Sequence, residues 1–290
     1  MERYTLNDLE KLTGIKTATI RIWERRYRLI KPHRTETNRR WYDDEDLRRI
    51  LNITILYRHD VKISVIAAMS GAEIEEKVSM LLRGNTTPDI QIDSLILGMV
   101  NLDEAAINDQ LMRSIINRGF AETFSGLVFP FLRRVGEMWM TGSIDIGAEH
   151  FVTNLFRRRL ICAIDSLPPP ANPEKKRVLM YLPEGELHEM GLLFFYFVIR
   201  KMGHEVLYLG QLTPFDAVAD IYDRWHPQVV ITGGMTGLPY TKPDEYLKRI
   251  SVRLHDVKIL VSGALATPAA KLSLPNVIAV RSELELGKYL

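Results

Sequence analysis

The carboxyl-terminal part of the 290-residue chain alternates short apolar runs with helical patterns, and this alternation limits the fold more than any other feature. The apolar runs between residues 177 and 280 are RVLMYLP, EVLYLG, QVVITGG, KILVSGA and NVIAV. Helical segments separate them, and SELELGKYL follows the last. Five short strands alternating with helices predict a doubly wound, mostly parallel sheet, Rossmann-like in form. Ligands of such sheets bind at the carboxyl ends of the strands.

The middle of the chain is helical in pattern. Residues 72–165 have almost no strand signal and contain four helical stretches with short joins, one of them beginning at Asp103. Pro130 lies inside another stretch, so we expect a kink or a break there. Four helices with short joins predict a four-helix bundle. A proline- and charge-rich linker, residues 167–177, separates the bundle from the predicted sheet.

The amino-terminal region has an uneven charge. Residues 16–41 hold nine Lys or Arg against two acidic residues, a local net charge of +7 in a chain whose total is +2. Such asymmetry is typical of a nucleic-acid-binding end on a near-neutral protein, and a solvated charged face is the alternative.

Two short helices are predicted in this basic region. YTLNDLEKLTG has leucines at helical spacing and is stopped by Gly14. IKTATIRIWERRYRLI predicts a second helix, capped by Thr17 or Thr19 and ended by Pro32. Its basic side chains at intervals of four and three form one stripe: Arg21, Arg25 and Arg28. A helix, a Gly-containing turn and a basic helix predict a helix-turn-helix.

A wing is predicted next. KPHRTETNRRWY fits a short β-hairpin whose arginines lie along phosphates. YDDEDLRRI begins a third helix, with Asp43 or Asp44 as its cap, and ISVIAAM predicts a fourth.

The segments IRIWERRY and TNRRWYDDEDL resemble the winged helix-turn-helix of the MerR family of transcription regulators, over about residues 3–70. The resemblance implies a dimer that binds double-stranded operator DNA. The side chains it assigns to DNA are Thr19, Arg21, Arg25, Arg26, Arg39, Arg40 and Tyr42. The aromatic residues of this region can equally be packing residues. For Tyr42 both interpretations stay open: a contact with a DNA phosphate, or packing in the core. The long coiled-coil helix that many MerR-type regulators carry is missing after residue 75, so the sensing part is a different module.

His188 lies in PEGELHEMG, just past the first predicted strand. The form Glu-x-His-x-x-Gly resembles the Asp-x-His-x-x-Gly motif of cobalamin-binding Rossmann domains. By this resemblance His188 is the lower cobalt ligand, Glu186 holds its other ring nitrogen, and Gly191 allows the nucleotide tail to pass. The residues implied along the tail are Thr232, Gly233, Gly234, Ser262 and Gly263. A surface histidine is the alternative for a lone His in a loop.

The segment WMTGSIDIGAEH joins two helices of the predicted bundle. Together with the head and the sheet it resembles the cobalamin-dependent photoreceptor repressors of the CarH/LitR group. In that group the tryptophan shields the adenosyl group, with the Glu and His nearby, and Trp139, Glu149 and His150 match. Members that use an upper histidine have it directly after the tryptophan, where this chain has Met140, a weaker thioether ligand.

The sequence therefore predicts a multidomain chain. An all-α winged helix-turn-helix occupies residues 1–75. A four-helix bundle, which caps the cofactor, occupies residues 76–168. A Rossmann-like five-stranded parallel sheet occupies residues 176–290. The amino terminus does not resemble a signal peptide, no run is long enough to cross a membrane, and one cysteine, Cys162, excludes an intrachain disulfide. We expect a cytoplasmic protein.

The function that these resemblances imply is a transcriptional repressor, not an enzyme, that binds adenosylcobalamin between bundle and sheet. Light or cobalamin state would control a homo-oligomer, dimer or tetramer, and thereby operator binding. The alternatives are a cofactor-independent regulator controlled by a protein partner and a light-independent cobalamin sensor. An enzyme module, a mutase or methyltransferase, is disfavoured by the DNA-binding head.

Overall fold

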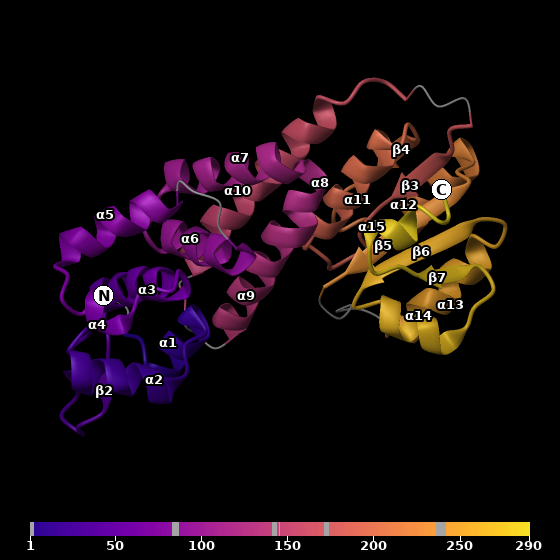
Figure 1. Cartoon of the computed structure of the whole chain (residues 1–290). Helices are drawn as coiled ribbons and strands as arrows, with labels where there is room; N and C mark the ends of the chain where they lie inside the picture. Colours follow the sequence, from indigo (N-terminus) through magenta and orange to yellow (C-terminus); the bar gives the residue numbers. More distant parts are fainter. Residues whose placement is uncertain (1–2, 83–86, 141–143, 145, 171–173, 236–241) are drawn as a thin grey trace. The chain divides into compact units, whose positions relative to one another are not determined.

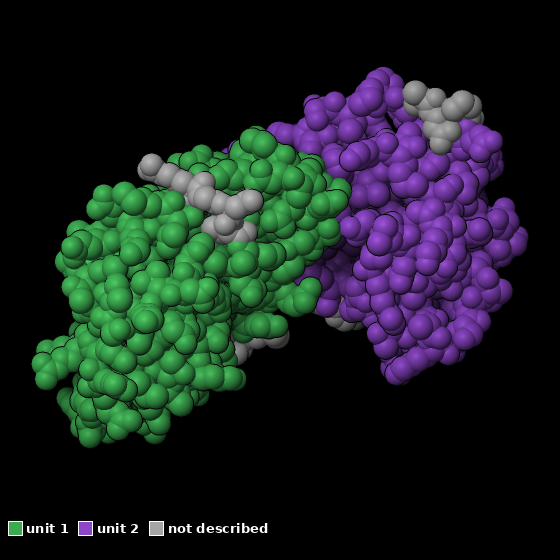
Figure 2. Space-filling view, viewed as in Figure 1, with its two compact units in different colours: residues 1–156 green, residues 157–290 purple. Residues whose placement is uncertain are grey.

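The computed structural model describes residues 3–82, 87–140, 144, 146–170, 174–235 and 242–290. The chain forms two compact units, Met1–Phe156 and Arg157–Leu290, which Figure 2 distinguishes by colour. Among the described residues, no helix combines the length and the apolar character needed to cross a bilayer.

The first unit begins with the predicted winged helix-turn-helix (Figure 1). Its elements are α1 (Leu6–Thr13), α2 (Thr17–Ile22), the π-helix η1 (Trp23–Tyr27), β1 (His33–Arg34), β2 (Arg40–Trp41), α3 (Asp44–Arg58), α4 (Ile63–Ile66) and α5 (Gly71–Leu82). Strands β1 and β2 pair antiparallel and form the wing. The predicted hairpin and the helices around it are confirmed.

The ends of the helices show which local predictions hold. Gly14 ends α1 in the left-handed conformation, and Asp43 caps α3 through a reciprocal capping box with Asp46. The predicted threonine cap of the second helix is wrong, since the N-cap is Lys16, whose side chain makes no capping hydrogen bond. The Glu10 carboxylate of α1 instead accepts the backbone N–H of Thr17 at 2.8 Å. A contact between two helices thus replaces a local cap.

The basic helix is shorter than its pattern predicts. After Ile22 the helix widens into η1, and Arg28 ends it with a left-handed backbone, φ 53°. Arg28 therefore does not extend the predicted stripe of Arg21 and Arg25. Leu29 and Ile30 leave the helix to become core residues.

The bundle helices follow the predicted order: α6 (Pro88–Val100), α7 (Glu104–Arg118), α8 (Phe120–Thr123), the π-helix η2 (Phe124–Val128), α9 (Phe129–Met140) and α10 (Ile146–Asp165). Asp103 caps α7, as expected. Helical structure runs from residue 120 to residue 140 past Pro130, and the π turn of η2 ends two residues before the proline. Such a turn is a recognised way to accommodate an interrupted helical hydrogen-bond ladder.

Head and bundle pack together within the first unit. Helix α3 contacts both α5 and α6, and α1 contacts α9. The domain boundary predicted at residue 75 falls inside α5. The buried faces of these helices therefore form shared interfaces between the two predicted domains.

The second unit contains the predicted parallel sheet. Its strands are β3 (Arg177–Met180), β4 (Glu205–Tyr208), β5 (Val229–Gly234), β6 (Lys258–Gly263) and β7 (Val277–Ala279). Its connecting helices are α11 (Met190–Lys201), α12 (Phe215–Trp225), α13 (Pro243–Arg253), α14 (Ala266–Leu272) and α15 (Glu283–Leu286). All strand pairs are parallel, in the order β4-β3-β5-β6-β7. The order reverses between β3 and β5, where a doubly wound sheet binds its ligand.

One face of this sheet packs on α12, α13 and α14 around a buried tyrosine pair. Leu179 and Tyr181 alternate with Val178 and Met180 along the chain, so that the first two join this core. The hydroxyls of Tyr181 and Tyr246 lie 2.7 Å apart and bond one another. Burial raises the pKa of Tyr181 to about 12. The pair is a polar contact inside an apolar layer, and each hydroxyl depends on the other.

We predict that Tyr181→Phe lowers the free energy of unfolding by about 1–3 kcal/mol, because it leaves the Tyr246 hydroxyl buried without this partner. Tyr181→Phe combined with Tyr246→Phe is expected to cost less than the sum of the two single changes, since neither tyrosine hydroxyl is then left without the other. Urea unfolding at pH 7 measures all three, and purely additive losses would contradict the pairing.

The same pair predicts a pH dependence. The raised pKa of Tyr181 means that the folded state binds the phenol proton more tightly than the unfolded chain, whose tyrosines titrate near 10. Its contribution is present below pH ~10 and is lost as pH rises toward 12. The double phenylalanine variant should lose less stability over that interval.

Candidate functional site

The basic face of the head carries exposed arginines from α2, from η1 and from the wing. Arg21, Arg25 and Arg26 lie on α2 and η1, and Arg39 lies in the wing turn just before β2. All four are exposed, whereas Thr19 is half-buried. These cations are available to phosphates.

Two of the predicted DNA-contacting residues form hydrogen bonds with Glu24. The Arg40 Nε donates to Glu24 Oε1 at 3.2 Å, and the Tyr42 hydroxyl donates to Glu24 Oε2 at 3.4 Å. Tyr42 is fully buried, and burial raises its pKa. Of its two interpretations, the structure supports packing. Glu24 thereby ties the recognition helix to the wing strand.

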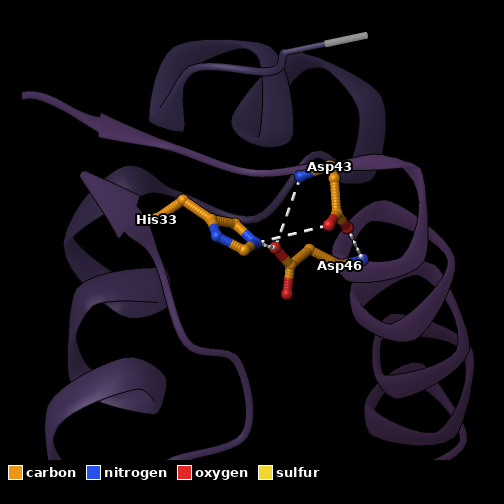
Figure 3. Close-up of side chains that lie close together, drawn as sticks. All are labelled: His33, Asp43 and Asp46. Atoms are coloured by element: carbon orange, nitrogen blue, oxygen red, sulfur yellow. Dashed lines mark hydrogen bonds and ion pairs between the residues drawn. The ribbon is translucent and has the colours of Figure 1, made fainter. Parts of the chain in front are cut away.

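The wing is also fixed at its first strand. His33 of β1 points at Asp43 and Asp46 where α3 begins (Figure 3), with its Nε2 at 3.3 and 3.5 Å from one oxygen of each. The ring stacks on Trp41 at 4.3 Å between centroids. These three side chains offer ligand atoms within 4.8 Å of one another, but both carboxylates already serve the capping box of α3. The cluster is best understood as an anchor for the wing.

His188 occupies the loop after β3, at the edge where the strand order reverses. Its Nδ1 lies 2.6 Å from Glu186 Oε1, and its backbone N–H donates to the same oxygen at 2.8 Å. The second oxygen of Glu186 accepts the backbone N–H of Met235, which follows β5, at 2.7 Å. Glu186 is 1% exposed and the His188 side chain 52% exposed. The buried carboxylate thus fixes a ring whose Nε2 edge reaches the surface.

The residue after His188 was missed by sequence reasoning. Glu189 is buried, and its carboxylate accepts from the Tyr208 hydroxyl at 2.6 Å and from Arg157 Nε at 2.5 Å. Burial is the main reason that the pKa of Tyr208 is raised, followed by this hydrogen bond. The available signal was a second acid beside the histidine at the start of an apolar helix. Glu189 fixes the loop to β4 and to α10.

The strand ends beside His188 are closely packed. Gly233 and Gly234 end β5 beside Ser262 and Gly263 of β6. A Cβ on Gly263, whose φ is 65°, would lie 2.2 Å from the Gly234 carbonyl oxygen. Thr232 is fully buried, and its side chain faces the hydroxyls of Tyr181 and Tyr246, whose pKa values it lowers.

The cap residues predicted in the bundle lie in the first unit. Trp139, on α9, has 53% of its surface exposed. His150 Nδ1 lies 2.7 Å from Glu149 Oε2, and the Thr153 hydroxyl donates to Glu149 Oε1 at 2.8 Å. The Met140 side chain and the turn at residues 141–143 lie outside the described residues. The structure therefore pairs Glu149 with His150 and presents an exposed indole on the preceding helix.

Comparison with known proteins bears on both regions. Residues 4–72 match the family described as "MerR HTH family regulatory protein", and residues 91–162 match the "B12 binding domain" family. The chain carries a MerR-type helix-turn-helix and a B12-binding domain. The second match covers most of α6 to α10.

Two transcriptional repressors of Myxococcus xanthus are homologous to this B12-binding regulator. CarH is 29% identical over 217 residues, which cover 73% of this chain and 72% of CarH. CarA is 27% identical over 234 residues, which cover 78% of this chain and 74% of CarA. A monomethylamine corrinoid protein of Methanosarcina barkeri shares the fold at 12% identity, with a TM-score of 0.54 over 66% of this chain and 92% of that one.

The residues at the His188 edge fit a cobalamin on their own chemistry. A neutral imidazole whose Nδ1 bonds a carboxylate offers Nε2 as a metal ligand, the usual arrangement for a metal-bound histidine. The open surroundings of Gly191 leave room beside the loop.

We predict that Gly263→Ala lowers the free energy of unfolding by more than about 1–2 kcal/mol, because a side chain is strained at this φ and meets the Gly234 carbonyl. Gly191→Ala is the matched control. A Cβ there would meet no atom within 4 Å from the described residues outside the same helix turn, and alanine in the first turn of α11 should raise the stability by up to about 1 kcal/mol. Urea unfolding of the protein without cofactor compares the two, and equal losses would contradict the assignment.

Proposed function

We propose that this chain is a transcriptional repressor that binds adenosylcobalamin and changes its assembly and operator affinity with the state of that cofactor. The observation that carries the proposal is the Glu186–His188 pair at the reversal of strand order. The buried acid holds Nδ1, and Nε2 remains for cobalt. Homology to two repressors supports the DNA-binding half of the proposal.

Each region of the chain has a part in this proposal. Bound adenosylcobalamin supplies a cobalt that takes an imidazole ligand and a cobalt–carbon bond that light breaks. His188 would coordinate the cobalt, and Gly191 and the strand-end residues Thr232, Gly233, Gly234, Ser262 and Gly263 would accommodate the nucleotide tail. Trp139, with Glu149 and His150, would shield the adenosyl group from water. In the sequence, Met140 stands where relatives that use an upper histidine have it.

The head would act through several copies at once. Each copy offers Arg21, Arg25, Arg26 and Arg39 to the DNA backbone. A cofactor-dependent homo-oligomer, dimer or tetramer, raises operator affinity through the effective concentration of linked heads. The cofactor would then control repression by shifting a two-state equilibrium between the assembled and the dissociated protein.

The first experiment mixes the purified full-length protein with adenosylcobalamin in the dark, removes free cofactor by desalting, and records the visible spectrum. Size-exclusion chromatography before and after illumination then reports assembly. We expect a retained chromophore and a light-dependent change in both spectrum and size. Retention with unchanged assembly would favour the light-independent sensor, and loss of the chromophore would favour the regulator without cofactor.

His188→Ala should release the cofactor on desalting, and Glu186→Gln should weaken binding about 10–100-fold, because the carboxylate orients the imidazole and raises its basicity. His255→Ala is the control, since His255 is an exposed histidine of the same unit. Titration followed by absorbance measures all three. An unchanged affinity in His188→Ala would overturn the assigned ligand.

Arg25→Ala and Arg39→Ala should each weaken DNA binding and reduce the slope of log affinity against log salt by about one, because each removes a phosphate contact. Arg281→Ala, which removes an exposed arginine of the second unit, should change neither. Fluorescence anisotropy over a salt series makes the measurement. A slope that is the same in all three variants would contradict the proposed face.

A further inference from the structure

A buried aspartate in the first unit is held by two arginines from different helices. Asp93 of α6 is fully buried. One of its oxygens accepts from Arg134 Nη1 of α9 at 3.0 Å, and the other accepts from Arg58 Nη1 at the end of α3. Burial raises the pKa of Asp93, and the two guanidinium groups oppose this rise. The three side chains join the last turn of a head helix to two bundle helices.

The same arginines also bind the end of α1. Arg58 Nη2 donates to the Thr13 carbonyl at 2.8 Å, and Arg134 Nη2 donates to the Leu12 carbonyl. These carbonyls lie at the helix C-terminus, where acceptors are unpaired and cations are favoured. Gly14 leaves space for the contact, since a Cβ there would lie 2.9 Å from Arg58 Nη2.

Planar guanidinium forks make this joint geometrically specific. Each fork must meet a carboxylate oxygen and a backbone carbonyl at once, which defines the relative position of α1, α3, α6 and α9. A buried ion cluster adds little net stability over an apolar one, and its best-attested contribution is to specify a geometry.

The joint lies between the two functional regions of the first unit. Arg134 is on α9, the helix that also carries Trp139. From α1, Glu10 accepts the backbone N–H of Thr17 and so contacts the start of the recognition helix. Helix α9 is therefore connected to the basic face through α1, by the hydrogen bonds of Arg134 and Glu10.

We propose that Asp93, Arg58 and Arg134 form the joint that keeps the DNA-binding head and the bundle in one body, and that transmits the cofactor state of α9 to the head. The second clause rests on the proposed function. Asp93 is a positioning residue, since it contacts neither DNA nor cofactor in the proposal.

Asp93→Asn in the full-length protein tests the joint. The amide keeps the shape of the side chain but loses the charge that both arginines need. Three readouts separate the possibilities: hydrogen exchange at the backbone amides of Gly14 and Ile15, retention of adenosylcobalamin by absorbance, and affinity for a duplex selected from a random library by the wild-type protein. Asp216→Asn is the matched control, because it breaks only an exposed ion pair with Arg249.

We expect Asp93→Asn to retain the cofactor within about threefold of wild type, while exchange at Gly14 and Ile15 accelerates. The ratio of duplex affinities with and without adenosylcobalamin in the dark should fall by about fivefold or more, the size of an ordinary allosteric coupling. A folded variant with unchanged exchange and an unchanged ratio would overturn the proposal.

Two further arms keep the test decisive. If Asp93→Asn does not fold, Arg134→Lys keeps a cation beside Asp93 but lacks the planar fork, and the same readouts apply. If the duplex affinity of the wild-type protein is the same with and without adenosylcobalamin, the proposed function fails together with the transmitting role. Hydrogen exchange still tests the joint in that case. Faster exchange at Gly14 and Ile15 in Asp93→Asn but not in Asp216→Asn supports the joint, and the same exchange rate in both variants rejects it.

Discussion

The His188 edge of the sheet depends on one buried carboxylate. The Glu186 carboxylate accepts hydrogen bonds from the backbone N–H and the ring of His188 and from the backbone N–H of Met235. These bonds join the loop after β3 to the loop after β5. Those strands are the pair between which the strand order reverses. A buried carboxylate without such donors is strongly destabilising, so the loop conformation and the ring orientation are specified together. The contact also selects the tautomer, because a proton on Nδ1 leaves the lone pair on Nε2.

Asp93 solves the same physical problem in the first unit by different means. Its charge is balanced by two cations, whereas Glu186 is satisfied by N–H groups and one imidazole. Two permanent cations hold a fixed geometry between helices, and nothing about Asp93 is open to a ligand. A carboxylate that orients a titratable ring leaves one nitrogen available. The same residue class therefore yields a rigid joint in one unit and a candidate ligand site in the other.

Much of this organisation follows from sequence periodicity, and the exceptions have tertiary causes. The five strands, the wing and the caps at Gly14 and Asp43 could be predicted because each depends on residues close in the chain. The N-terminus of α2 could not, since its bond comes from Glu10 of another helix. The pairing of Arg58 with Asp93 crosses a predicted domain boundary, and no local pattern encodes it.

This chain departs from the motifs of the cobalamin-binding families at two positions, Glu186 and Met140. The two positions lie in different units, so the parts of the proposed switch can be tested separately. Glu186 is one methylene longer than the usual aspartate, and it still reaches both the His188 ring and the end of β5. The longer side chain is therefore compatible with the conformation of the histidine loop in the second unit. Met140 follows Trp139 in the first unit. Under the proposed function, substitutions on α9 would alter the response to light and would leave the Glu186–His188 pair of the second unit in place.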